Sequence, residues 1–235
     1  MSTRFQTTLI DTVRCGPDVL MARFERPAGY SYEAGQWLRL TLGTSEGEET
    51  RTFTHASAPE DDWLEIATRL SGSSFKVALG ALSPGDAVTI VGPGGRLVLP
   101  EGTDRVVFLV GGMGVTPARS ILRHAVEEGW RFEDAIVFYG NRDPSCVPYG
   151  DEFEAMAEVG VRVIEVFEQV PPGSSAEKGL ITAGLVRRYL GTPFAGPYVV
   201  AGPPLMVGAM VSVLDELGVS PEMRMVEWFG TPKRT

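Results

Sequence analysis

Two glycine-rich segments in the second half of the sequence are suited to binding phosphates. Residues 111–117 read Gly-Gly-Met-Gly-Val-Thr-Pro, between an apolar run and an amphipathic segment. Glycines let a ligand approach the backbone, and a helix N-terminus offers free N–H groups to a phosphate. Thr116 suits the N-cap of that helix and Pro117 its first position. Residues 201–204, Ala-Gly-Pro-Pro, are expected to follow another strand in the same way.

These glycines alone do not prove a nucleotide site. Gly112 and Gly114 match the start of a dinucleotide fingerprint, but Pro117 stands where its third glycine would be. A tight turn without a ligand explains the same residues. The strand–loop–helix context favours the binding interpretation.

The first half of the chain carries two further segments with phosphate chemistry. On a strand, Arg51 and Phe53 would share one face, with Thr52 and Thr54 on the other. An arginine fork matches a diphosphate, and a nearby hydroxyl could hydrogen-bond a heteroaromatic ring. Residues 72–76, Gly-Ser-Ser-Phe-Lys, add hydroxyls and a cation at an expected helix start. The alternatives are an edge strand with a solvated arginine and ordinary helix capping.

Composition excludes several classes of protein. The 235 residues carry 21 Lys and Arg against 30 Asp and Glu, a net charge of -9, and 43% of them are apolar, enough for a core. A nucleic-acid-binding protein would need a basic stripe, so we expect no nucleic-acid partner. Cys15 and Cys146 form no CxxC motif, and the two histidines are His55 and His124. We therefore expect reduced thiols, no metal or iron–sulfur site and a cytoplasmic location, since no signal peptide opens the sequence.

One uncharged run has the length of a membrane helix. Residues 189–214 contain no charged side chain, and a membrane helix needs about 20 apolar residues. Glycines and prolines interrupt the run, Gly202, Pro203 and Pro204 among them, so a continuous helix is excluded. We expect a loop, a buried strand, a loop and a helix, and no membrane span.

The spacing of apolar residues divides the chain into two halves. In residues 36–42, Leu38, Leu40 and Leu42 alternate with other residues, the pattern of a half-buried strand. Similar short segments and one helix at 74–82 predict a small antiparallel barrel. The further strands are expected at 5–13, 19–24, 51–55, 63–68 and 87–91.

Beyond Pro100 the pattern becomes that of a parallel sheet. Residues 106–110 form a continuous apolar run, as in a strand covered on both faces. Strand and helix then alternate, which predicts βαβ units and a boundary near 100–104. Strands are expected at 106–110, 135–139, 161–167, 198–201 and 223–227, and helices after 117 and at 150–159, 182–190 and 205–217.

Seven short motifs occur in a defined order along the whole chain. They are R-x-F-T-x-x-S at 51–57, G-S-S-F-K at 72–76, G-P-G-G at 92–95, G-G-M-G-V-T-P at 111–117, Y-G-N-R at 139–142, A-G-P-P-L-M at 201–206 and E-W-F at 227–229. This series resembles the ferredoxin–NADP reductase-like flavoprotein oxidoreductases, here without a fused iron–sulfur domain. The resemblance implies an N-terminal antiparallel six-stranded Greek-key β-barrel that binds FAD, residues 1–101. A C-terminal parallel-sheet, Rossmann-like α/β domain that binds NAD(P) would follow, residues 102–235.

The resemblance also implies roles for individual residues. Arg51 would clamp the flavin phosphates, Phe53 would lie along the flavin and Thr54 would hydrogen-bond its N5 region. Glu227 and Phe229 would close the nicotinamide pocket, which makes Thr54 and Glu227 the expected catalytic residues. The other expected cofactor-binding residues are Thr52, Ala67, Thr68, Arg69, Gly72, Ser73, Ser74 and Lys76 for the flavin, and Gly111, Gly112, Gly114, Thr116, Arg142, Gly202, Pro203 and Met206 for the nucleotide.

The implied activity is hydride transfer from NADH or NADPH to FAD, followed by electron transfer to a separate acceptor. With two cysteines there is no intrinsic iron–sulfur relay, so the acceptor would be another protein, such as a ferredoxin or an oxygenase component, or a small molecule. The alternative is a non-catalytic flavin- or nucleotide-binding subunit that senses redox state or relays electrons in a larger complex. FMN in place of FAD, the choice of nucleotide and the oligomeric state stay open. Ala201 stands where many relatives have Cys, and its effect stays open too.

Overall fold

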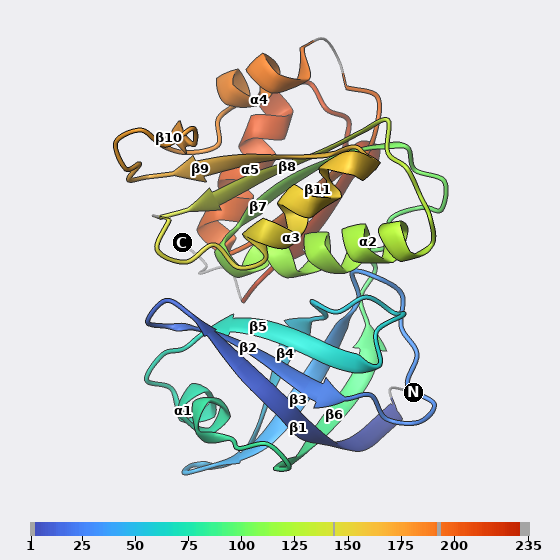
Figure 1. Cartoon of the computed structure of the whole chain (residues 1–235), viewed down its shortest axis with the longest axis vertical. Coiled ribbons are helices and arrows are strands. Elements are labelled where there is room, and N and C mark those ends of the chain that lie inside the picture. Colours follow the sequence, from blue (N-terminus) through green and yellow to red (C-terminus); the bar gives the residue numbers. More distant parts are fainter. Residues whose placement is uncertain (1–2, 143, 192–193, 231–235) are drawn as a thin grey trace. The chain divides into compact units, whose positions relative to one another are not determined.

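The computed structural model describes residues 3–142, 144–191 and 194–230. Contacts between residues divide the chain into two units (Figure 1). Unit 1 comprises residues 1–99 together with 119–124, and unit 2 comprises 100–118 together with 125–235. No helix of the described residues has the length and apolar character that crossing a membrane requires.

Unit 1 is built on a six-stranded antiparallel sheet, as the spacing of apolar residues predicts. Its strand order is β4-β3-β6-β1-β2-β5, and every strand pair is antiparallel. Leu38, Leu40 and Leu42 are buried while Arg39 is exposed, so the alternation along β3 places the leucines in the core. The strands are β1 (Thr3–Cys15), β2 (Val19–Glu25), β3 (Trp37–Thr44), β4 (Gly47–Thr54), β5 (Trp63–Arg69) and β6 (Ala87–Gly94).

The helix of unit 1, α1 (Ser74–Ala81), begins where the serine pair predicts it. Ser73 is the N-cap, and its side chain accepts a hydrogen bond from the backbone N–H of Lys76. Phe75 and Leu79, four residues apart, bury one face of the helix in the core of the unit. This docking holds the N-terminus of α1 in place beside the sheet.

Unit 2 contains a six-stranded parallel sheet of order β10-β9-β8-β7-β11-β12. The strands are β7 (Arg105–Gly111), β8 (Asp134–Asn141), β9 (Val161–Phe167), β10 (Glu177–Lys178), β11 (Tyr198–Gly202) and β12 (Arg224–Trp228). The helices are α2 (Val115–Glu127), α3 (Gly150–Ala155), α4 (Ala183–Leu190) and α5 (Pro204–Glu216), with 3₁₀ turns η1 (Gly112–Gly114), η2 (Met156–Val159) and η3 (Pro221–Met223). The two-residue strand β10 has no counterpart in the sequence prediction, because it is too short to show periodicity.

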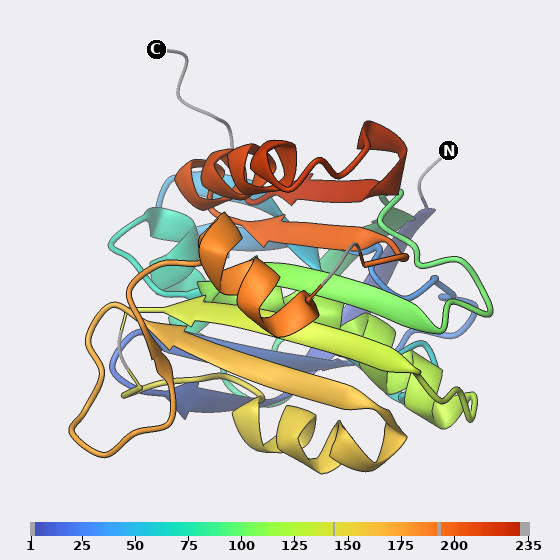
Figure 2. The same ribbon diagram turned by 90° about the horizontal axis from the view of Figure 1, so that it is seen from above.

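The order of the parallel strands reverses between β7 and β11. From β7 the chain adds β8 and β9 on one side, then returns to place β11 and β12 on the other. Because such crossovers are right-handed, the helices lie on opposite faces: α3 on one face, α4 and α5 on the other (Figures 1 and 2). A reversal of this kind is the switch point at which open α/β sheets bind ligands.

Two local expectations are wrong. Thr116 is not an N-cap, because the 3₁₀ turn η1 leads directly into α2 and places Thr116 inside the helix. Its hydroxyl donates instead to the carbonyl of Met113, at 3.1 Å. Neither Cys15 nor Cys146 is a free thiol, so the expected reduced form is wrong. Cysteine spacing could not show this, because the state of a thiol depends on the geometry that the folded chain gives it.

His55 is fully buried in the core of unit 1. Its Nδ1 donates to the Gln36 carbonyl at 2.6 Å, its Nε2 accepts from the Tyr30 hydroxyl at 3.0 Å, and its ring stacks on Tyr32 with centroids 3.8 Å apart. Burial, with the nearby Arg26 charge, lowers the pKa of His55 to about 3, against the raising effect of the Gln36 carbonyl. His55 is therefore a neutral structural residue at physiological pH.

This burial predicts a specific loss of stability in mild acid. The pKa of His55 is about 3 in the folded protein and about 6.5 in the unfolded chain, so the unfolded state binds the proton more tightly. Stability from this group is complete above about pH 6.5 and falls by up to about 1.4 kcal/mol per pH unit towards pH 3. Urea unfolding between pH 7 and 4.5 should show a shallower pH dependence for His55→Gln than for the wild type. Parallel curves for His55→Gln and the wild type would contradict the prediction.

Candidate functional site

Cations and aromatic rings meet in unit 1 where β4 faces the start of α1. Phe53 stacks on Phe75, with ring centroids 5.9 Å apart. The Nζ of Lys76 lies 4.6 Å from the centre of the Phe53 ring, and the guanidinium of Arg51 lies 5.4 Å from that of Phe75. Arg51 and Phe53 share a face of β4, as expected for alternate residues, so two cations are held within one cluster.

The polar groups of this cluster can bind an anion. Ser73 and Ser74 lie at the N-terminus of α1, and the Lys76 Nζ hydrogen-bonds the Thr68 hydroxyl. Burial, together with the Arg51 charge, lowers the pKa of Lys76 to about 8. The positive charges of Arg51 and Lys76 repel each other, and an anion bound beside them would offset this repulsion. The cluster is therefore suited to a phosphate-bearing ligand.

Some residues expected to bind the flavin stand apart from this cluster. Thr52 is exposed on the opposite face of β4, and Arg69 forms an ion pair with Asp18. Thr54 is buried at the end of β4, and Ala67 is buried within β5, two residues before its end. A Cβ on Gly72 would meet nothing within 4 Å, so this glycine leaves open space before α1.

In unit 2 the two glycine loops pack against each other at the switch point. A Cβ on Gly114 would lie 2.0 Å from the carbonyl oxygen of Ala201, so no side chain fits there. Gly111 lies against Met206, whose Sδ would be 3.5 Å from an added Cβ. Pairing between β11 and β12 sets Glu227 opposite Ala201. These contacts gather three of the predicted segments at the carboxyl edge of the sheet.

The same edge offers backbone donors for a nucleotide. Pro203 is the N-cap of α5 and provides no side-chain cap, so the first N–H groups of this helix have no partner within it. Gly112, with φ of +51°, has nothing within 4 Å of an added Cβ. The N–H of Phe229 donates to the Gly202 carbonyl at 2.9 Å, which ties the end of β12 to this loop. A helix N-terminus beside an open glycine backbone suits a phosphate.

Two further residues that are predicted to bind the nucleotide, Thr116 and Arg142, differ in their exposure to solvent. Thr116 is only 1% exposed and is held by Met113, so its side chain is not on the surface of the loop. Arg142 is exposed just after β8, one strand away from β7, and its carbonyl accepts from the Gln169 N–H at 3.0 Å. Arg142 therefore lies at the same edge of the sheet as the glycine loops, and its side chain is accessible to solvent.

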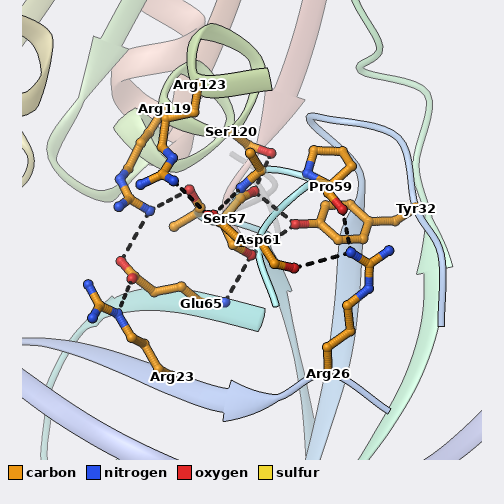
Figure 3. A network of polar contacts seen from close by, with 12 residues as sticks. Arg23, Arg26, Tyr32, Ser57, Pro59, Asp61, Glu65, Arg119, Ser120 and Arg123 are labelled. Carbon is orange, nitrogen blue, oxygen red and sulfur yellow. Dashed lines mark hydrogen bonds and ion pairs between the residues drawn. The ribbon is translucent and has the colours of Figure 1, made fainter. Parts of the chain in front are cut away.

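Unit 1 contains a buried network of charges that was not predicted from the sequence (Figure 3). Arg119 and Glu65 are each 1% exposed and form an ion pair at 3.3 Å. Arg119 also donates to the Ala56 carbonyl at 2.7 Å, and the Nε of Arg23 donates to Glu65 at 2.7 Å. A charged residue inside an apolar pattern was the available signal, because it requires a buried partner.

The network extends along the loop that follows β4. Ser120 donates to the carbonyl of Ser57 at 2.7 Å, and Arg123 donates to Asp61 at 2.6 Å. The Tyr32 hydroxyl lies 2.9 Å from the Ser57 hydroxyl. Residues 119–124 thereby hold the loop directly after Thr54, the residue expected beside the flavin.

Comparison with known proteins supports a redox function. A family model described as an oxidoreductase NAD-binding domain matches residues 108–212. Ferredoxin–NADP reductase B of Sorangium cellulosum is 33% identical over 192 residues, which cover 79% of this chain and 78% of that protein. The reductase component of propane 2-monooxygenase from Mycolicibacterium goodii is 28% identical over 92% of this chain, but the match spans only 64% of the relative's length.

Solved structures share the fold across both units. The ferredoxin NADP+ reductase of Neisseria gonorrhoeae, solved with bound FAD and NADP, aligns with a TM-score of 0.84 over 97% of this chain and 99% of that chain. Its sequence is 21% identical, so the likeness concerns the fold. The Amycolatopsis cytochrome P450 reductase GcoB aligns with a TM-score of 0.83 over 99% of this chain and 72% of that chain, at 22% identity.

Proposed function

We infer the function of this chain from its family, since it belongs to the ferredoxin–NADP reductase-like flavoprotein oxidoreductases. We propose that it transfers hydride from NAD(P)H to FAD and then passes electrons to a separate acceptor. One observation carries the proposal: unit 1 contains a cluster of two cations and stacked phenylalanines, and unit 2 contains a switch-point edge of glycine loops. The first is suited to a flavin nucleotide and the second to a nicotinamide nucleotide. Residues 1–101 are proposed to bind FAD and residues 102–235 NAD(P)H.

The residues have distinct proposed tasks. Arg51 and Lys76 neutralise the flavin phosphates, and the serines at α1 donate hydrogen bonds to them. Phe53 packs along the flavin ring, and the hydroxyl of Thr54 hydrogen-bonds its N5 region without adding charge. Bound FAD supplies the redox chemistry, while the protein aligns the reactants and excludes water.

On the nucleotide side, the glycine loops and the N-terminus of α5 hold the phosphates of NAD(P)H. Glu227 and Phe229 border the nicotinamide, and Gly111, Gly202 and Met206 form the adjoining wall. Arg142 is exposed and is available for the 2′-phosphate of NADPH, while NADH remains the alternative donor.

The acceptor is proposed to be a separate protein or a small molecule. The relatives include a ferredoxin–NADP reductase and reductase components of a monooxygenase, which supports a protein acceptor such as a ferredoxin or an oxygenase component. The cytoplasm is the proposed location. The competing proposal is a flavin-holding sensor or relay subunit, which would not need Thr54 and Glu227 in a reactive arrangement.

Anaerobic reduction tests the proposal directly. Flavin-loaded protein mixed with NADH or NADPH should lose its yellow colour with at least one of them, and extraction of the flavin identifies FAD or FMN. Thr54→Ala and Glu227→Ala should slow this bleaching by about 100-fold or more, since each removes a group that is proposed to lie at the reacting atoms. Unchanged rates in both variants would favour the sensor, and a colour that persists with both nucleotides would contradict the reductase.

Loss of Arg51 should release the flavin. Removing a charge-assisted hydrogen bond to a phosphate costs about 1.5–3 kcal/mol, so Arg51→Ala should weaken FAD binding by about 10–150-fold. Equilibrium dialysis measures the Kd. Arg4→Ala is the matched control, because Arg4 is an exposed arginine of the same unit whose ion pair with Glu48 spans 3.8 Å. Equal Kd values for the two variants would remove Arg51 from the site.

A further inference from the structure

Glu49 lies within the cluster that is proposed to hold the flavin phosphates. It is two residues before Arg51 on β4, so the two side chains share a face of the strand. One carboxylate oxygen pairs with the Arg51 guanidinium and the other accepts from the Ser74 hydroxyl. The hydroxyl of Thr44 also donates to Glu49, at 3.1 Å.

The carboxylate is charged at neutral pH. The hydrogen bond from Ser74 lowers the pKa of Glu49 below its usual range, and Thr44 and Arg51 act in the same direction against the effect of burial. Glu49 therefore presents an anion to two of the donors that the proposed function assigns to the phosphates. A carboxylate and a phosphate use the same geometry towards arginine.

A diphosphate and this carboxylate cannot both use these donors well. Like charges a few ångströms apart repel, and the donor of Ser74 is a single hydroxyl hydrogen. Glu49 can leave, because β4 is an edge strand of the sheet and the neighbouring segment is a turn at residues 45–46. Movement of the side chain towards solvent requires no change in the core.

We propose that Glu49 is an internal competitor of the flavin diphosphate: its carboxylate occupies the anion position between Arg51 and Ser74 and must leave it before FAD binds. The inference rests on the proposed function, and it assigns Glu49 control over the affinity for phosphate-bearing flavins. The opposite role would be a carboxylate that orients Arg51 towards the ligand. The two roles predict opposite effects of removing the charge.

Titration of the flavin-free protein with four ligands tests this role. FAD, FMN and riboflavin are followed by flavin fluorescence, and ADP by its competition with FAD and by calorimetry. Glu49→Gln should bind FAD and ADP about 10-fold more tightly than the wild type, because one negative charge facing two phosphates is removed. Riboflavin has no phosphate and should bind equally to both proteins, with FMN between these limits.

Glu48→Gln is the matched control. Glu48 is the preceding residue of β4, it is exposed, and it lies 3.8 Å from Arg4. The Glu48→Gln substitution removes the same charge from the opposite face of the strand. The Kd of this variant for FAD should stay within about twofold of the wild type, as expected for exposed charges. Glu49→Ala should behave like Glu49→Gln, because the effect comes from the lost anion.

The outcomes separate this inference from the proposed function. Unchanged or weaker binding of FAD and ADP by Glu49→Gln would overturn the competitor role, as would an equal gain for riboflavin or for Glu48→Gln. Whether the wild type binds FAD at all tests the proposed function and not the role of Glu49. A wild type that binds ADP but not FAD would refute the flavin proposal, while the ADP comparison would still decide the role of Glu49. A wild type that binds neither FAD nor ADP would overturn both the flavin proposal and the competitor role of Glu49.

Discussion

Arg119→Met is expected to lower the free energy of unfolding by about 3–5 kcal/mol, since it leaves Glu65 charged in the interior with part of its pairing removed. Both side chains are 1% exposed, so water cannot replace the lost partner. Arg23 keeps its hydrogen bond to Glu65, which places the effect towards the lower end of that range. Urea unfolding followed by circular dichroism measures the change.

Removing both charges should cost less than removing one. Arg119→Met combined with Glu65→Leu replaces the ion pair by apolar residues, a change that is often close to neutral. Arg187→Met is the surface control, because Arg187 and Glu216 are each at least half exposed, and such pairs contribute about 0–1 kcal/mol. A loss for Arg119→Met no larger than for Arg187→Met would show that the buried pair does not stabilise unit 1.

Gly114→Ala should abolish reduction by nicotinamide nucleotides while leaving FAD binding intact. The new Cβ would lie 2.0 Å from the oxygen and 2.5 Å from the carbon of the Ala201 carbonyl. Both obstacles are backbone atoms, so the two glycine loops must move apart. Such overpacking costs at least about 1–3 kcal/mol. It also displaces the edge that is proposed to hold the nucleotide phosphates.

Gly208→Ala is the matched control for this substitution. Gly208 lies within α5, and an added Cβ meets nothing within 4 Å. Alanine there should raise stability by about 0.5–1 kcal/mol and leave the rate of reduction unchanged. The measurements are the Kd for NAD(P)+, the anaerobic rate of flavin reduction and the FAD content. Reduction of Gly114→Ala at the wild-type rate would contradict the role given to these loops.

The elements of both units could be predicted from local patterns. The alternating leucines of residues 38–42 and the apolar run at 106–110 lie in strands of the expected kinds, β3 and β7. The serine pair at 73–74 marked the start of α1, and the order of the seven motifs indicated the family. These features rest on neighbours along the chain, so a single sequence contains them.

The remote contacts were decided by the tertiary structure. Arg119 meets the Ala56 carbonyl across 63 residues of sequence, and Ser74 meets Glu49 across 25. His55 became an uncharged core residue because Tyr30, Tyr32 and Gln36 surround it. No periodicity shows which distant group will balance a buried charge or occupy an anion position.

The sequence by itself determined the elements, their order and the residue types at both glycine loops. Packing alone decided which charges are buried together, because the cost of burying a charge depends on partners that only the folded chain brings near.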